Sequence, residues 1–210
     1  MNLQKLFEAQ AELDEHIEKK HPRKEGEDRL SKKILALQVE LAECAQEWRG
    51  FKFWRNDQEP RTEIPIDCPY CYGKGYMNHD EVFEGGEPWP CKRCDGSGVY
   101  GYKNPLLEEF VDCLHFILSI GNEIKFDREI TGRYINDSIT EQFNSVFEDV
   151  GNLMKSIRED QPDSDLKAWY EELVRGIIGL GEMLGFSWGQ IEDAYFSKNA
   201  VNHSRQENGY

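Results

Sequence analysis

The sequence lacks any long apolar segment. Among its 210 residues, no run approaches the length that spans a bilayer. The first twenty residues, MNLQKLFEAQAELDEHIEKK, are amphipathic and charged and lack the apolar core of a signal peptide. We therefore expect a cytoplasmic protein with no membrane partner, long enough for one large domain or for one domain with an insertion.

Positive charge is also scarce. The chain has 25 lysines and arginines against 40 aspartates and glutamates, a formal net charge of -15. Because such a chain repels a polyanion, the composition argues against binding a nucleic-acid polymer through its phosphates. A single nucleotide could still be held locally through metal ions.

Proline is rare outside one segment, since six of the eight prolines lie between Pro60 and Pro105, where no helical period is found. Elsewhere apolar residues recur every three or four positions, which predicts helices. We expect helices over about residues 3–20, 31–48, 104–121, 138–158 and 166–184, and a last one opened by a Ser187–Gln190 capping box. The predicted fold is an all-α bundle (residues 1–59 and 102–210) interrupted by an insertion at residues 60–101.

Four of the six cysteines form two C-x-x-C-x-G-x-G units within this insertion. In a reducing compartment such pairs indicate a metal rather than disulfides. Four thiolates are the ligands of a closed, structural Zn²⁺ site. The units resemble the zinc-binding repeats of DnaJ co-chaperones, in this segment alone. The predicted zinc ligands are Cys68, Cys71, Cys91 and Cys94.

Two predicted helices carry carboxylates at helical spacing. Glu40, Glu43 and Glu47 lie in the second helix, and Glu109 and Asp112 in the third. Residues three or four apart share one helix face, so two such faces opposed would form a cage of four carboxylates. An all-oxygen cage suits Mg²⁺ or Mn²⁺, and either Glu43 or Glu47 could be the general base of a hydrolysis.

A solvated surface is the alternative reading of each carboxylate pair. However, the third helix is apolar around nearly its whole circumference, so carboxylates in it need partners. Three other features have two readings. The Phe51–Trp54 aromatic group is a corner of the core or a lid, His115 is a core histidine or faces the metal, and the polar tail is a fraying end or a set of phosphate donors.

Three motifs carry a family resemblance. They are Glu40-Leu-Ala-Glu43 with Phe-Lys-Phe-Trp behind it, the stretch Glu108–Gly121, and the ending Lys198–Tyr210. In this order they resemble the dimeric all-α dUTPases, part of the all-α NTP pyrophosphohydrolases that include MazG-like enzymes and occur in bacteria and phages. The resemblance covers residues 1 to about 56 and 102–210.

The resemblance implies a homodimer that hydrolyses dUTP to dUMP and pyrophosphate. It implies Mg²⁺ ions held by Glu40, Glu43, Glu109 and Asp112. The implied substrate contacts are Gln10 at the uracil, Trp54, His115 and Phe116 around the base and deoxyribose, and Lys198, Asn199, Asn202 and Arg205 over the phosphates.

The sequence departs from the family pattern at two places. Many members carry asparagine where Asp14 stands, and the minimal family lacks the zinc insertion. Two alternatives to a dUTPase remain open: a MazG-like enzyme for other nucleoside triphosphates, and a non-enzymatic adaptor whose zinc module binds a protein or nucleic acid.

Overall fold

The computed structural model describes residues 3–77, 89–127 and 129–209. Within these residues the chain forms six helices and four short strands, so the all-α prediction is confirmed. The chain divides into two compact units, Met1–Pro60 with Leu106–Tyr210, and Arg61–Pro105. The helices are α1 (Leu3–Lys20), α2 (Arg29–Trp48), α3 (Pro105–Glu123), α4 (Ile139–Arg158), α5 (Asp163–Met183) and α6 (Trp188–Glu207).

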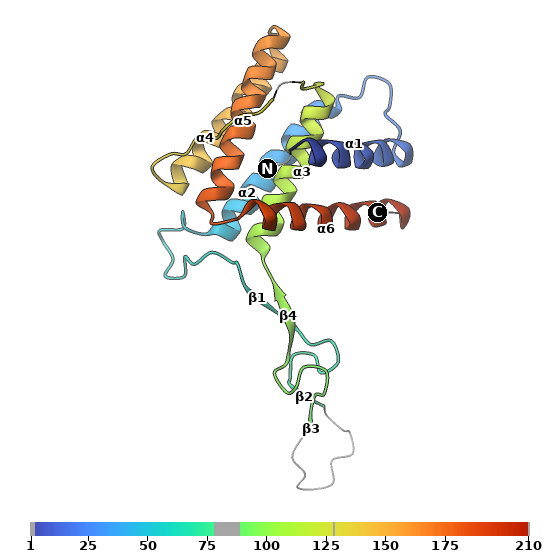
Figure 1. Ribbon diagram of the computed structural model, residues 1–210, viewed down its shortest axis with the longest axis vertical. Coiled ribbons are helices and arrows are strands. Elements are labelled where there is room, and N and C mark those ends of the chain that lie inside the picture. The colour runs from blue at the N-terminus through green and yellow to red at the C-terminus, as the bar shows by residue number, and fades with distance from the viewer. Residues whose placement is uncertain (1–2, 78–88, 128, 210) are drawn as a thin grey trace. The chain divides into compact units, whose positions relative to one another are not determined.

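Helix α3 runs through the middle of the helical unit (Figure 1). Its sequence is apolar on most sides, and eleven of its residues are buried. Among them Phe110, Ile117 and Ile120 are at most 1% exposed. The prediction of a helix buried around most of its circumference is thus confirmed, and the carboxylates that α3 carries lie on its one polar stripe.

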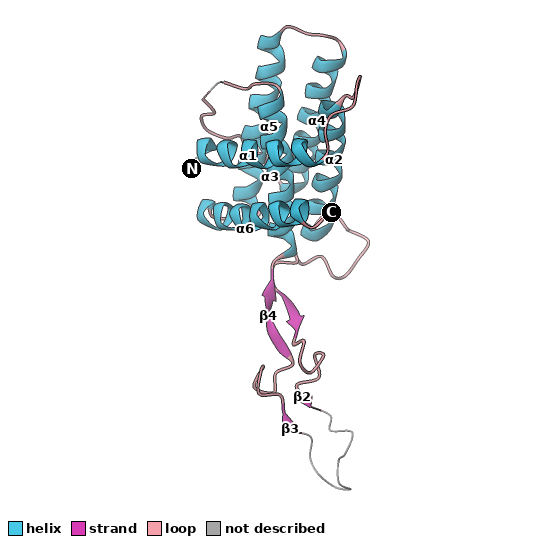
Figure 2. Cartoon of the chain, turned by 90° about the vertical axis from the view of Figure 1, so that its right-hand side faces the viewer, coloured by secondary structure: helices cyan, strands magenta, loops and turns pink. Residues whose placement is uncertain are grey.

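The helices around α3 form pairs (Figure 2). Helices α1 and α6 are parallel, since the ion pairs Lys5–Glu192 and Lys20–Glu207 both join residues 187 positions apart. Helices α2 and α3 are antiparallel, because Lys33 near the start of α2 pairs with Glu123 at the end of α3. Helices α4 and α5 form a hairpin that packs on α2. No helix in the described parts of the chain is long and apolar enough to cross a membrane.

Local sequence signals set the helix ends. The Ser187 hydroxyl accepts from the Gln190 amide, and the Gln190 side chain accepts from the Ser187 amide, as the predicted capping box requires. At the end of α2, Arg49 takes the left-handed conformation, with φ of 68°. The next residue must be small, because a Cβ on Gly50 would lie 2.4 Å from the Trp48 ring.

The second unit contains two antiparallel strand pairs that the sequence did not predict. Strand β1 (Ile64–Asp67) pairs with β4 (Val99–Lys103), and β2 (Tyr76–Met77) pairs with β3 (Trp89–Pro90). These strands are too short to show a period of two in the sequence. Each pair joins a segment that flanks the first cysteine knuckle to a segment that flanks the second, so the strands pair where the two knuckles come together.

Candidate active site

Three carboxylates from α2 and α3 form a compact group, the carboxylate cluster, made of Glu40, Glu43 and Glu109. One oxygen from each lies within 4.8 Å of the others. Desolvation by burial raises the pKa of Glu40 to about 7, and repulsion from Asp112, Glu43 and Glu109 adds to the rise. Burial followed by repulsion raises the pKa of Glu109 as well. Carboxylates that destabilise one another in this way, with only oxygen donors, fit a hard divalent cation.

Asp112 lies beside the cluster but has a cationic partner of its own. Lys198 of α6 donates to Asp112 through a short hydrogen bond, and both side chains are largely buried. Glu47, one turn beyond Glu43 on α2, is close enough to raise the pKa of Glu109. The five predicted carboxylates are therefore gathered at the same end of the α2–α3 pair.

A cavity of about 850 Å³ begins at Glu40 and Asp112 and runs along four helices. Each helix contributes residues spaced three, four or seven apart, so each presents one face to the cavity. The lining residues are Gln10, Asp14 and Glu18 on α1; Lys33, Ala36 and Glu40 on α2; Asp112, Phe116, Ser119 and Glu123 on α3; and Lys198, Asn202 and Arg205 on α6.

Beyond the carboxylate cluster, side chains that line the cavity are joined in a hydrogen-bond network around Asp14. Gln10, only 3% exposed, donates from Nε2 to Asp14 Oδ1 at 2.9 Å. Its Oε1 accepts from the Tyr195 hydroxyl at 3.0 Å and lies 2.8 Å from His115 Nδ1. Ser119 donates to both carboxylate oxygens of Asp14, at 2.8 and 2.9 Å.

His115 is a neutral acceptor in this wall. Since Gln10 Oε1 can only accept, His115 Nδ1 carries the proton, and Nε2 presents a lone pair. Nε2 is buried and has no hydrogen-bond partner among the described residues. Burial, assisted by the charge of Lys198, lowers the pKa of His115 to about 3. The ring of His115 stacks on Tyr195, and the residue lines the cavity. That it faces the metal stays a prediction.

Comparison with known proteins assigns the chain to a family. A family model described as dUTPase matches residues 2–67 and 101–210 of the chain. The chain belongs to the dUTPase family. No curated protein and no solved structure matches it. At the level of the family the activity is that of a nucleotide pyrophosphohydrolase acting on dUTP, and dUTPases generally use Mg²⁺.

Most substrate contacts that the dUTPase resemblance implied lie at the cavity, but two do not. Gln10, His115, Phe116, Lys198, Asn202 and Arg205 line it. Asn199 is instead buried, and its amide approaches the Ala9 carbonyl at 3.5 Å. Trp54 is 63% exposed and is absent from the cavity lining, and Phe53 beside it is 84% exposed, so this aromatic group is not a corner of the core in the chain by itself.

Sequence reasoning missed two residues that hold polar side chains of the dUTPase cavity in place. Ser119 holds Asp14, and Tyr195 holds Gln10. A signal for Ser119 was available, because it lies seven residues after Asp112 and so on the same face of α3. No comparable pattern in the sequence pointed to Tyr195, because its hydroxyl meets Gln10 only where α1 and α6 pack side by side.

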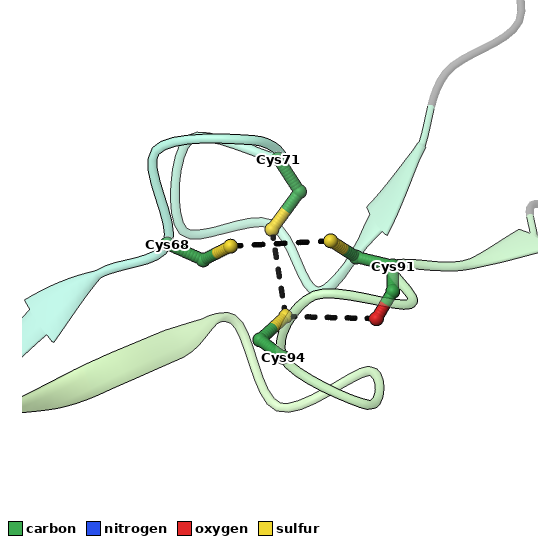
Figure 3. A group of neighbouring side chains, drawn as sticks. All are labelled: Cys68, Cys71, Cys91 and Cys94. Carbon is green, nitrogen blue, oxygen red and sulfur yellow. Dashed lines mark hydrogen bonds between the residues drawn. The ribbon is translucent and has the colours of Figure 1, made fainter.

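The family match omits residues 68–100, the segment that contains the four predicted zinc ligands. Figure 3 shows their thiols converging on one point. The Sγ atoms of Cys68 and Cys91 are 3.9 Å apart, and those of Cys71 and Cys94 are 3.8 Å apart. A tetrahedron with Zn–S bonds of about 2.3 Å has edges of about 3.8 Å, so the four thiols fit one Zn²⁺ ion.

The glycines of the two knuckles explain the repeated motif. The amide of Gly75 donates to Cys71 Sγ at 3.3 Å, and that of Gly98 donates to Cys94 Sγ at 3.2 Å. Both glycines have positive φ, 78° and 76°. A Cβ on Gly75 would lie 2.3 Å from the Gly96 carbonyl oxygen. Only glycine permits this turn and this approach, which is why each C-x-x-C pair is followed by G-x-G.

Proposed function

We propose that this protein is a Mg²⁺-dependent dUTP diphosphatase, which adds water across the bond between the α- and β-phosphates of dUTP to give dUMP and pyrophosphate. The observation that carries the proposal is the carboxylate cluster at the end of a large cavity. Membership of the dUTPase family supports it. The cavity of about 850 Å³ is ample for a deoxynucleoside triphosphate.

In this proposal Glu40, Glu43, Glu109 and Asp112 would hold the Mg²⁺ ions. When bound, Mg²⁺ would neutralise the charge of the triphosphate and polarise the phosphoryl group that is attacked. The carboxylates by themselves would repel the substrate. Either Glu43 or Glu47 accepts the proton of the attacking water, and the position of Glu47 next to the cluster, rather than within it, favours Glu47 for this role.

Lys198 has two alternative partners in the proposed reaction. Without ligand its ammonium group neutralises Asp112. With Asp112 as a metal ligand, Lys198 would be available to contact the phosphates, together with Asn202 and Arg205 on the same face of α6. Asn199, the fourth predicted phosphate contact, would need a shift of its side chain away from Ala9.

The nucleoside takes the part of the cavity beyond the phosphates, with Gln10 at the base and with His115 and Phe116 at the base and sugar. Trp54 is proposed to line a pocket only in a homodimer, where part of each site could come from the other subunit.

The insertion at residues 60–101 is proposed to be a module whose Zn²⁺ is structural, since four thiolates leave no open position for chemistry. We propose a cytoplasmic location.

The test is pyrophosphate release by the purified protein, with Mg²⁺ or with EDTA, across dUTP, dTTP, dCTP, UTP and the purine deoxynucleotides. We expect dUTP turnover that EDTA abolishes. Equal turnover of all nucleotides would instead indicate a MazG-like enzyme. No turnover would contradict the proposal and favour the zinc-module adaptor.

A matched pair of variants on α3 tests the carboxylate cluster. Glu109→Gln should lower kcat/KM by at least 100-fold, because one metal ligand is lost. Glu108→Gln, which removes the same charge from the adjacent exposed position, should leave turnover within about twofold of the unmodified protein. Equal effects of the two substitutions would contradict the assigned site.

A further inference from the structure

The unit that contains the four cysteines, Arg61–Pro105, carries most of the exposed aromatic side chains that the structure describes. The buried cluster of this unit consists of the cysteines themselves, so the rings lie outside its core. Each of these rings is between 39% and 82% exposed. They belong to Tyr70, Tyr72, Tyr76, Trp89, Tyr100 and Tyr102.

Two of the tyrosines contact an arginine. Tyr70 and Arg93 take the same place in the two knuckles, the third residue of each C-x-x-C, and the knuckles meet at the four thiols (Figure 3). The guanidinium carbon of Arg93 lies 5.4 Å from the ring centroid of Tyr70 and 5.4 Å from that of Tyr100. Arg93 Nη2 also donates to the Tyr100 hydroxyl at 3.4 Å. These cation–π contacts hold the guanidinium in place. We call Tyr70, Arg93 and Tyr100 the tyrosine–arginine cluster.

The positive charge of this cluster is not neutralised by a neighbour. Within the described residues no carboxylate forms an ion pair with Arg93. Cations of the helical unit are bound differently, since Arg29 pairs with Glu18 and Lys33 pairs with Glu123. The Tyr70 and Tyr100 rings remain 58% and 54% exposed. The cluster therefore presents one positive charge between two accessible aromatic rings.

A cation between aromatic rings matches the repeating unit of a single-stranded nucleic acid. Each nucleotide has a phosphate, which an arginine can bind through two hydrogen bonds, and a base, whose flat face stacks on a tyrosine. The bases of a duplex are already stacked on one another, so a duplex cannot use the rings in this way. The chemistry of the cluster thus favours an unpaired strand.

The charge of the unit permits this partner, although the whole chain is acidic. Residues 61–105 contain five lysines and arginines against seven aspartates and glutamates, whereas the rest of the chain contains 20 against 33. In the described part of the unit the balance is five against three. Net negative charge opposes a partner bound through many phosphates, but stacking on two rings needs only one or two of them.

A protein partner fits this surface less well. Tyrosine and arginine are enriched at protein interfaces, but lysine is depleted there. Here Lys92 adjoins Arg93 in the sequence, and Lys103 adjoins the exposed Tyr102. Lysines interspersed with aromatic residues are typical of surfaces that bind single strands.

We propose that the tyrosine–arginine cluster binds single-stranded nucleic acid, with one base on each of the two tyrosine rings and Arg93 at the phosphate between them. The inference goes beyond dUTP hydrolysis and does not depend on it, because all three residues lie in the unit Arg61–Pro105. It gives a function to the segment that the dUTPase family match omits.

Binding is measured by fluorescence anisotropy of a labelled dU oligonucleotide of 12 residues, titrated with the zinc-loaded protein in buffer without Mg²⁺. We expect saturable binding that excess dUMP does not displace, since dUMP would occupy the cavity of the helical unit. The duplex of this oligonucleotide with its dA complement should bind at least tenfold more weakly. The rU oligonucleotide should bind within about threefold, because the rings contact the base and not the 2′-hydroxyl.

Variants compare the cluster with another exposed group of aromatic and basic residues, Phe53 and Arg55 of the helical unit. Arg93→Gln should weaken binding at least fivefold and reduce the slope of log Kd against log salt concentration by about 0.7, because one phosphate contact is lost. Arg55→Gln removes the same charge and should change neither quantity. Replacing Tyr70 and Tyr100 together by leucine should weaken binding at least tenfold, whereas Phe53→Leu should not.

Two controls accompany these variants. Elemental analysis should find one zinc ion per chain in each, which shows that the knuckles are intact. The value of kcat/KM for dUTP should stay within about twofold in Arg93→Gln, so a failure of dUTP hydrolysis would contradict the proposed function and leave this inference standing.

Four results would overturn the inference. The unmodified protein binds the dU oligonucleotide no more tightly than the duplex, or does not bind it at all. Excess dUMP displaces the oligonucleotide. The substitutions at Phe53 and Arg55 weaken binding as much as those in the cluster. A labelled peptide of 12 glutamates binds more tightly than the oligonucleotide, which would assign the surface to an acidic polypeptide instead.

Discussion

Glu40 is the carboxylate on which burial and like charge act most strongly. Its pKa is raised from 4.5 to about 7, so between these values the folded protein binds more protons than the unfolded chain. The contribution of Glu40 to the free energy of unfolding of the metal-free protein should therefore fall as the pH rises from about 4.5 to 7. Because Glu40 is only half-buried, we expect its part of the fall to be about 1 kcal/mol.

The measurement is urea unfolding of the metal-free protein at pH 5 and pH 8, compared with Glu40→Gln. His115 acts in the opposite sense, since its pKa is lowered, so only the difference between the two proteins isolates Glu40. From pH 5 to pH 8, the free energy of unfolding should change less favourably for the unmodified protein than for Glu40→Gln, and the difference is the contribution of Glu40. An identical pH dependence in both would contradict the raised pKa.

Glu43 and Glu47 occupy successive turns of α2. Substituting each of them should show which one binds the metal and which one is the general base. Glu43→Gln removes an oxygen from the carboxylate cluster, so it should raise the Mg²⁺ concentration needed for half-maximal turnover about tenfold or more. Glu47→Gln should leave that concentration unchanged and lower kcat by 10²-fold or more, as expected for loss of a general base. Magnesium titrations of pyrophosphate release measure both quantities, and the reverse pattern would exchange the two roles.

At the scale of elements, α6 depends on its first turn to present its polar stripe. Ser187→Ala removes the hydroxyl that accepts from the Gln190 amide and should cost about 1 kcal/mol of stability. Ser197→Ala, in the middle of the same helix, should cost less, because Ser197 only bonds back to the Asp193 carbonyl. Urea unfolding of both variants makes the comparison. A larger loss for Ser197→Ala would show that the cap does not stabilise this helix.

At the scale of the whole molecule, the two compact units should respond differently to loss of metal. Cys68→Ser should reduce the zinc content below one ion per chain and expose Arg61–Pro105 to proteolysis, because the cysteines supply most of the buried apolar side chains of that unit. The helical circular dichroism signal should persist, since the separate core of the bundle contains none of these residues.

Cys44→Ala provides the matched control for zinc. Cys44 is buried in the bundle core and lies outside the cluster of four, so its loss should leave one zinc ion per chain by elemental analysis. Unchanged zinc content in Cys68→Ser, or loss of the helical signal together with the zinc, would contradict a self-contained structural site.

Local patterns in the sequence predicted much of this protein. Periodicity located the helices, because a helix that buries one face must repeat its apolar residues every three or four positions. The spacing of Glu40 and Glu43, and of the cysteine pairs, predicted which side chains would act together, because i and i+3 share a helix face and C-x-x-C closes a tight turn. Family motifs extended these predictions to a dUTPase.

Contacts between distant segments were decided only by the tertiary structure. Lys198 lies 86 residues from Asp112, and Tyr195 lies 185 residues from Gln10, so no local pattern could pair them. The same packing left Trp54 exposed and turned His115 into a neutral acceptor at the cavity. The sequence by itself determined the helices and the types of ligand, since both follow from neighbours along the chain. Only the packing of α1, α2, α3 and α6 decided the cavity and the charge state of its walls, because burial and hydrogen-bond partners depend on distance in space.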